Sequence, residues 1–325
     1  MTFTIRPFAY TEADYEGIAA VELAIFPDNP DLVADFKHHD ETRNPDYFYR
    51  RVVVEQGGEI VAYANYGQMH WAAEAAAYSM GIYVHPAAEG NGVGTAVYAH
   101  ILAELRGCDP PPARLYTFTR EDKPRAMRFL QERGFEIGMR WIASTLDVAR
   151  FDAAAYAPLA ARLAAAGVDI VPLPALRAQD PDWAHKLYEL DWACTQDEPQ
   201  PTPPKKLPFA DYERQFLNNP SLTDWLVAVV NDEYVGMTQL YKGTDDAMRR
   251  TGFTGVVRGW RRRGLATLLK VRAIAAAQQQ GVALIRTGNE AHNPMLALNR
   301  QLGFEDVVVQ VSMQKEMGTE GATAS

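Results

Sequence analysis

The chain has 325 residues, 47% of them apolar and 22% charged, the composition of a folded globular protein that is long enough for two domains. Its net charge is −9 and it has no long lysine or arginine tract, which argues against nucleic-acid and membrane partners. The two cysteines, Cys108 and Cys194, make no disulfide framework or metal-binding pair. We recognise no signal peptide or membrane span, and we expect a soluble, cytoplasmic protein without a metal.

A series of elements runs through the N-terminal half of the chain. Alternating apolar residues and turn-forming glycines at Gly57–Gly58 predict a β-hairpin, and a glycine-containing turn, EGNGVG, predicts the start of a helix. In chain order we expect a strand at 4–7, the hairpin at 51–65, a strand at 78–84, the turn at 89–94, a helix that stops near Gly107, a strand at 114–119 and a proline-started helix before Gly134–Phe135.

The same series recurs in the C-terminal half. We expect a strand at 169–173, a hairpin at 225–240 around Asn231–Asp232, a strand at 251–257, a turn at 261–266, a helix to Gly281, a strand at 282–287 and a proline-started helix before Gly303–Phe304. The shared order predicts two copies of one α/β fold, at 1–150 and 168–325, joined by a linker helix at 151–167. The proline-rich stretch 197–208 predicts a loop inside the second copy, and residues 318–325 predict disorder.

The two turns suggest a binding site for an anion. A strand that runs into a glycine turn and then a helix leaves backbone N–H groups free at the positive end of the helix dipole, where a phosphate or diphosphate can bind. Neither turn has the spacing of a nucleotide-hydrolase P-loop or of a dinucleotide fingerprint. One such turn is equally typical of a simple tight connection, but two turns at equivalent places favour anion binding.

The turns and the late Gly-Phe pairs resemble the GNAT (Gcn5-related N-acetyltransferase) superfamily. The family's R/Q-x-x-G-x-G/A turn matches Arg261, Gly264 and Ala266, and its late asparagine matches Asn293. In the first copy the glycines fit, but Glu89 takes the place of the arginine or glutamine. The resemblance covers nearly the whole chain, as two family domains in tandem. The chain is also similar to two-domain acetyltransferases of the mycothiol synthase type.

The resemblance implies a mixed sheet in each copy, flanked by helices, with two central strands that splay apart around acetyl-CoA. It implies that the turn binds the CoA diphosphate, that the edge of the preceding strand binds the pantetheine amides, and that an acetyl group passes to an amine of a small molecule. The cofactor-binding residues would be Val256, Val257, Arg261, Arg262, Arg263, Gly264, Leu265, Ala266, Thr267, Asn289 and Asn293 in the second copy and Ile82, Tyr83, Val84, Gly90, Asn91, Gly92, Val93, Gly94 and Thr95 in the first. Because Glu89 is acidic, we expect the second copy to be the tighter site.

The catalytic acid and base are not evident from the sequence. Many members of the family carry a tyrosine five residues before the phenylalanine of the Gly-Phe pair, as acid for the departing thiolate, but Leu130 and Asn299 occupy these positions. The weak candidates for acid–base roles are Glu290, His292, Asp246, Tyr241 and Tyr78. Asn293 before a proline is typical of a helix N-cap, and Lys270 is either a phosphate contact or solvated surface. Neither cysteine falls near a turn or strand end in this pattern, which favours direct transfer over an acyl-cysteine intermediate.

These observations leave two classes of function open. The first is an acetyl-CoA-dependent N-acetyltransferase that acts on a primary amine of a small molecule, as a monomer or a homodimer. The second is an acyl-CoA-binding sensor or interaction protein that has lost its catalytic groups. A dinucleotide oxidoreductase is a third reading, and the repeated Gly-Phe element argues against it. Release of thiol from acetyl-CoA in the presence of amines separates the first two.

Overall fold

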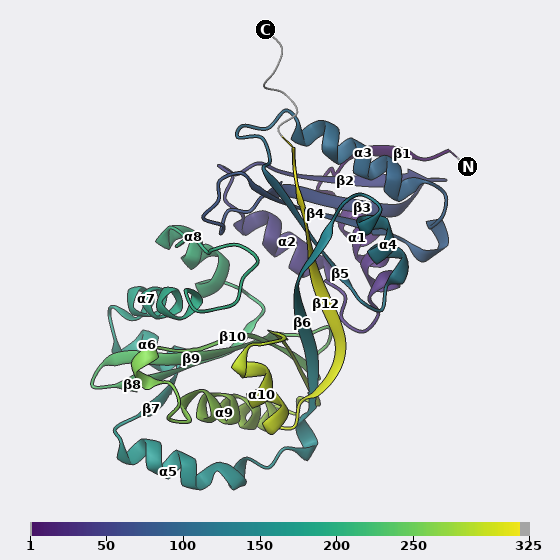
Figure 1. Cartoon of the computed structure of the whole chain (residues 1–325). Coiled ribbons are helices and arrows are strands. Elements are labelled where there is room, and N and C mark those ends of the chain that lie inside the picture. The colour runs from purple at the N-terminus through teal and green to yellow at the C-terminus, as the bar shows by residue number, and fades with distance from the viewer. Residues whose placement is uncertain (1, 319–325) are drawn as a thin grey trace. The chain divides into compact units, whose positions relative to one another are not determined.

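The chain forms two compact units in a computed structural model that describes residues 2–318 (Figure 1). Residues 319–325, where most of the predicted disorder falls, lie outside the described residues. No helix among the described residues is long and apolar enough to cross a membrane. Unit 1 comprises the described residues of Met1–Met139, Pro201–Lys205 and Val311–Ser325, and unit 2 comprises Arg140–Gln200 and Lys206–Gln310.

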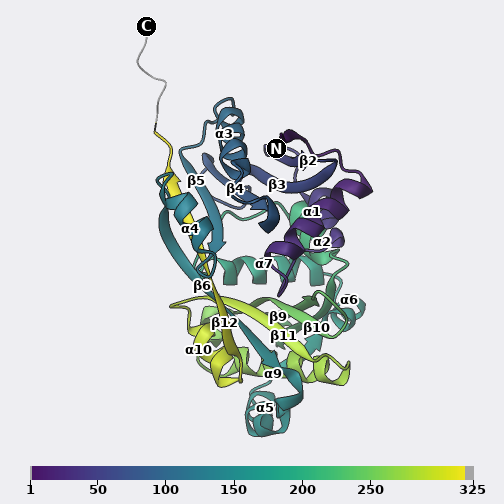
Figure 2. The ribbon, with the colours of Figure 1, turned by 90° about the vertical axis from the view of Figure 1, so that its right-hand side faces the viewer.

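Unit 1 is a sheet with helices on both faces. Its strand order is β1-β2-β3-β4-β5-β12, and α1 packs against β3 while α3 packs against β4. The views in Figures 1 and 2 place α1 and α3 on opposite faces of this sheet. The elements are β1 (Thr4–Pro7), α1 (Glu12–Ile25), α2 (Val33–Thr42), β2 (Tyr49–Gln56), β3 (Glu59–Gln68), β4 (Ala77–Val84), α3 (Val93–Leu105), β5 (Arg114–Arg120) and α4 (Pro124–Gln131).

Unit 2 repeats this plan. Its strand order is β6-β11-β10-β9-β8-β7, and α9 packs against β8, β9 and β10. Its elements are α5 (Ala157–Ala165), β7 (Asp169–Pro172), α6 (Leu173–Gln179), α7 (Trp183–Thr195), α8 (Phe209–Tyr212), β8 (Leu222–Val230), β9 (Glu233–Lys242), β10 (Met248–Val256), α9 (Leu265–Gln279), β11 (Leu284–Glu290) and α10 (Pro294–Gln301). The predicted class, two α/β repeats with mixed sheets, is confirmed, because each unit combines parallel and antiparallel strand pairs.

The last strand of each repeat is divided between the units. β6 (Glu136–Asp147) begins in unit 1, but from Arg140 onward it belongs to unit 2, where it pairs antiparallel with β11. β12 (Glu305–Glu316) begins in unit 2, and from Val311 onward it belongs to unit 1, beside β5. Each repeat therefore contributes a strand segment to the sheet of the other. The expected domains, 1–150 and 168–325, did not include this exchange.

The turns and the loop follow their sequence signals. Both residues of each hairpin turn have positive φ, 63° and 86° at Gly57–Gly58 and 47° and 64° at Asn231–Asp232, as a tight two-residue hairpin requires. The proline-rich stretch is irregular, as expected, but it does not stay within the second repeat. Its residues Pro201–Lys205 belong to unit 1, where the N–H of Ala73 donates to the carbonyl of Pro203 over 2.9 Å.

Candidate functional site

The central parallel strands of each unit pair at one end only. β4 and β5 pair from Ala77↔Arg114 to Ser79↔Tyr116, although β4 continues to Val84 and β5 to Arg120. β10 and β11 likewise pair from Met248 to Arg250 and then separate. Within residues 2–318, the facing edges of these strands pair with no other strand beyond these points, so their peptide groups on that side are available to another molecule. The splayed central strands predicted from the resemblance are confirmed.

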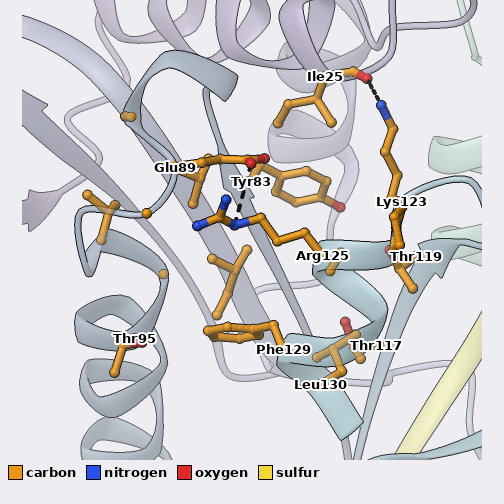
Figure 3. Close-up of a pocket in the computed structure, with 18 of the residues that line it drawn as sticks. Ile25, Tyr83, Glu89, Thr95, Thr117, Thr119, Lys123, Arg125, Phe129 and Leu130 are labelled. Atoms are coloured by element: carbon orange, nitrogen blue, oxygen red, sulfur yellow. Dashed lines mark hydrogen bonds and ion pairs between the residues drawn. The ribbon is translucent and has the colours of Figure 1, made fainter. Parts of the chain in front are cut away.

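A pocket of about 550 Å³ lies in unit 1 where β4 and β5 diverge (Figure 3). Its walls come from the end of α1, both strands beyond the split, the turn before α3, and α4. Eight of the nine residues predicted to bind the cofactor in this copy line it: Ile82, Tyr83, Val84, Gly90, Gly92, Val93, Gly94 and Thr95. The ninth, Asn91, turns its amide to the carbonyl of Ala88 over 3.4 Å. The structure thus brings the predicted set together around one cavity.

The turn before α3 presents free backbone donors to this pocket. Gly90 and Gly92 have φ of 83° and 81°, a conformation that glycine adopts at little cost. Gly92 is the N-cap of α3 and makes no side-chain cap. In the described part of the chain, no N–H group of residues 90–95 donates to a protein acceptor. A run of unsatisfied donors at a helix N-terminus fits a diphosphate.

The corresponding turn of unit 2 has the same backbone path but a different covering. Arg262 and Gly264 have φ of 60° and 88°, so a non-glycine residue holds the first left-handed position. A Cβ at Gly264 would lie 2.7 Å from Leu159 of α5, and Arg162 of the same helix donates to the carbonyl of Arg263 over 3.1 Å. The helix that we predicted as a linker therefore packs on this turn and takes up part of the space beside it.

Two arginines, one just before this turn and one at its first position, are already paired. Arg258 and Arg261 both donate to Asp197, at 2.5 Å and 2.6 Å, and Arg261 also donates to the carbonyl of Val256. The two guanidinium groups hold the pKa of Asp197 well below its usual range. Arg263 stacks on the ring of Trp260, 4.7 Å from its centre. Of the three arginines that the sequence places at this turn, Arg261 is therefore held by an acidic partner and Arg263 by an aromatic ring.

The two asparagines that we expected near the cofactor in unit 2 also have protein partners. Asn293 caps α10 by accepting from the N–H of Met295 over 2.9 Å, which confirms the predicted N-cap. Asn289 accepts from the amide of Asn299 over 2.5 Å. A role for either in binding CoA stays a prediction.

The candidate acid–base residues are dispersed. Glu290 is buried and accepts from both the backbone and the ring of His292, at 2.8 Å and 2.9 Å, and Asp246 is exposed. The hydroxyl of Tyr241 donates to Gln239, and that of Tyr78 donates to the carbonyl of Pro110. Burial raises the pKa of both tyrosines. None of the five lines the pocket of unit 1.

The structure differs from the sequence analysis at Cys194. This residue lies on α7 and approaches β10, because a Cβ at Gly255 would be 2.6 Å from the Cβ of Cys194. Its thiol is buried, and burial raises the pKa to about 12. A protonated, enclosed thiol is a poor nucleophile, so the argument against an acyl-cysteine intermediate now rests on the pKa and not on position.

The position of Lys270 also differs from both predictions made for it. It is neither a surface residue nor an exposed phosphate contact, since it is only 3% exposed and lies 5.5 Å from the ring of Phe304. Burial lowers its pKa to about 8. Apolar residues occur on all sides of α9, including Leu268, Leu269 and Val271, and this pattern could have indicated that the helix is buried all round.

Glu22 is a buried carboxyl that the sequence analysis did not single out. It accepts from the hydroxyl of Tyr63 over 2.5 Å, and Tyr63 stacks on Tyr83 of the pocket wall at 4.4 Å. Burial raises the pKa of Glu22 to about 7. It lies one helical turn before Ile25 and Phe26, which line the pocket. Nothing local in its sequence distinguishes it from an exposed glutamate, because its partners come from distant strands.

The comparison with known families decides the assignment. The model of the acetyltransferase (GNAT) family matches residues 14–135 and again residues 184–304, one segment in each repeat. The chain is a tandem member of the GNAT family. Members of this family are acetyltransferases and generally bind acetyl-CoA. No curated protein sequence matches the chain significantly.

Solved structures show the same tandem fold. A tandem GNAT protein from the clavulanic acid biosynthesis pathway, solved without acetyl-CoA, is 21% identical and superposes with a TM-score of 0.77 over 98% of this chain and 100% of its own. A GNAT protein from Sphaerobacter thermophilus is 18% identical, with a TM-score of 0.70 over 97% and 95%. The glucosamine N-acetyltransferase region of a fungal multi-domain β-N-acetylglucosaminidase is 14% identical, with a TM-score of 0.69 over 96% of this chain and 38% of that one. At these identities the likeness concerns the fold.

Proposed function

We propose that this GNAT protein is an acetyl-CoA-dependent N-acetyltransferase whose cofactor site is the pocket of unit 1 and whose acceptor is a primary amine of a small molecule. One observation carries the proposal: the pocket lies where β4 and β5 diverge and includes the donor-rich turn before α3. The sequence favoured the turn of unit 2, but the packing of α5 and the pairing of Arg258 and Arg261 with Asp197 support unit 1.

Different residues of the pocket suit different parts of acetyl-CoA. The N–H groups of residues 90–95 suit the diphosphate, and the free edge of β4 at Ile82–Val84 suits the pantetheine amides. The apolar side chains of Met80, Phe129 and Leu130 provide an environment that excludes water from the thioester.

In this reaction the main role of the protein is to position the amine and the thioester next to each other. The amine nitrogen attacks the thioester carbonyl, a C–N bond forms, the C–S bond breaks with its electron pair passing to sulfur, and the proton lost by the amine passes to the thiolate or to water. A backbone N–H on the free edge of β4 would stabilise the negative oxygen of the intermediate. No acyl group passes through the protein, so the transfer is direct, in a ternary complex.

The proposal is tested by titration and turnover together. Calorimetry should show one tight acetyl-CoA site per chain, and a panel of small primary amines should include at least one that releases thiol from acetyl-CoA. Tight binding with no thiol release by any amine would favour the acyl-CoA-binding sensor over the enzyme. Absence of binding would contradict both.

The pH dependence of kcat/KM should give no sign of an enzyme side chain that acts as a general acid for the departing thiolate. Leu130 and Asn299 occupy the usual acid positions and Tyr78 donates its proton to a carbonyl, so we expect kcat/KM to rise through a single pKa with no fall at alkaline pH. A thiol has a pKa of about 8.5, so its thiolate leaves without strong acid help. Profiles measured from pH 6 to 10 for the wild type, Tyr78→Phe and Tyr241→Phe should superimpose after scaling. An alkaline limb that disappears in one variant would identify that tyrosine as the acid.

A further inference from the structure

We propose that Arg125 of α4 supplies the positive charge that neutralises the CoA diphosphate in unit 1, and that Glu89 holds its guanidinium beside the turn until the coenzyme binds. The inference rests on the proposed function and assigns the diphosphate a partner from outside the turn. In the family pattern the position of Glu89 carries an arginine or glutamine, and an acid there would repel the ligand.

Arg125 reaches the turn from a separate element. It lines the pocket, and Figure 3 shows its side chain extending from α4 across the pocket to Glu89, on the loop before α3. Its Nε lies 3.5 Å from a carboxylate oxygen of Glu89. Its Nη2 lies 3.1 Å from the point where Gly90 would carry a Cβ. The absence of a side chain at Gly90 therefore gives the guanidinium room to lie against the turn.

The ion pair between Arg125 and Glu89 is weak enough for Arg125 to leave Glu89 and bind the diphosphate. The side chains are 64% and 40% exposed, and an exposed ion pair at 3.5 Å contributes little to stability. A diphosphate brings at least two negative charges and can accept two parallel hydrogen bonds from a guanidinium. Because the same guanidinium already lies against Gly90, the first residue of the run of free N–H groups, it can turn from Glu89 to a ligand bound there with a small side-chain movement.

The turn of unit 2 shows the opposite arrangement. There the arginine at the family position, Arg261, is bound to Asp197 and to the carbonyl of Val256. Unit 1 has an acid at the family position and a cation delivered from α4. The charge therefore reaches the turn of unit 1 from an element more than thirty residues away along the chain, about which the turn sequence carries no information.

The test compares two thioesters that differ in the diphosphate. Arg125→Gln should weaken acetyl-CoA binding about 10-fold and raise its KM by a similar factor, while kcat/KM for S-acetyl-pantetheine, which lacks the diphosphate, stays unchanged. Arg125→Lys should recover part of the loss. Glu89→Gln should tighten acetyl-CoA binding about 3-fold, because the free carboxylate no longer competes for the guanidinium or repels the ligand. Arg128→Gln, on the same helix but away from the pocket wall, is the matched control.

Each outcome bears on one proposal or on both. Normal acetyl-CoA affinity in a folded Arg125→Gln protein would overturn the inference, and an equal loss with both thioesters would reduce Arg125 to a structural role and overturn it as well. If the wild type binds acetyl-CoA but a charge placed in the pocket of unit 1 leaves that binding intact, the proposed site itself fails. If the wild type does not bind acetyl-CoA, both fail.

Discussion

Replacing Gly94 by aspartate should abolish acetyl-CoA binding, with a loss of at least about 100-fold. Gly94 lines the pocket in the first turn of α3, and its φ is not in the left-handed region. A Cβ there would make only ordinary van der Waals contacts, 3.5 Å from the ring of Phe129 and 3.9 Å from Val84, so the variant should fold. The carboxylate would lie among the donors proposed for the diphosphate, and two like charges about 4 Å apart repel by about 4 kcal/mol near a protein surface.

Unit 2 supplies a matched control for this change. Ala266 is the second residue of α9 as Gly94 is the second residue of α3, so Ala266→Asp places the same charge at the same point of the other repeat. We expect calorimetry to show unchanged acetyl-CoA affinity for this variant. Loss of binding in Ala266→Asp with normal binding in Gly94→Asp would transfer the site to unit 2, the location that the arginines around Gly264 suggested from sequence. Loss of half the stoichiometry in each variant would indicate two sites.

Replacing Lys270 by methionine should stabilise the protein at pH 7 by about 1–3 kcal/mol. Lys270 is 3% exposed, and burial lowers its pKa to about 8 from 10.5, a difference that corresponds to about 3 kcal/mol spent on keeping the ammonium charged. Methionine fills a similar volume without a charge. The favourable contact of the ammonium with Phe304 offsets part of this gain.

The pH dependence of stability should identify Lys270 as the cause. Between about pH 8 and 10.5 the unfolded chain holds a proton on Lys270 that the folded protein has lost, so the free energy of unfolding should rise with pH across this window. In Lys270→Met this contribution should vanish, and the advantage of the variant should shrink toward pH 10. Arg272→Met, an exposed cation two residues further along α9, should change neither the stability nor its slope by more than about 0.5 kcal/mol. Destabilisation by Lys270→Met at pH 7 would show that the buried ammonium has a compensating partner.

Several features of this protein follow from its sequence because they depend on neighbouring residues. The hairpins at Gly57–Gly58 and Asn231–Asp232 form because these residues tolerate positive φ, and Asn293 caps its helix because its side chain reaches the N–H two residues on. The repeated order of such signals is sufficient to predict two copies of one α/β fold. The splayed strands within them were implied by the resemblance of the turns and Gly-Phe pairs to the GNAT family.

The tertiary structure decided what depends on contacts between distant segments. β6 and β12 follow the two Gly-Phe pairs, where the sequence analysis predicted no strand, and each ends beside strands of the other repeat. The arginines around Gly264 look available in the sequence, yet Asp197 binds Arg258 and Arg261 and α5 packs on the turn. Glu89 looks unfavourable at the other turn, yet Arg125 comes from α4 to meet it. The identity of a residue fixes its charge, whereas the folded chain decides which partner neutralises that charge and whether water reaches it.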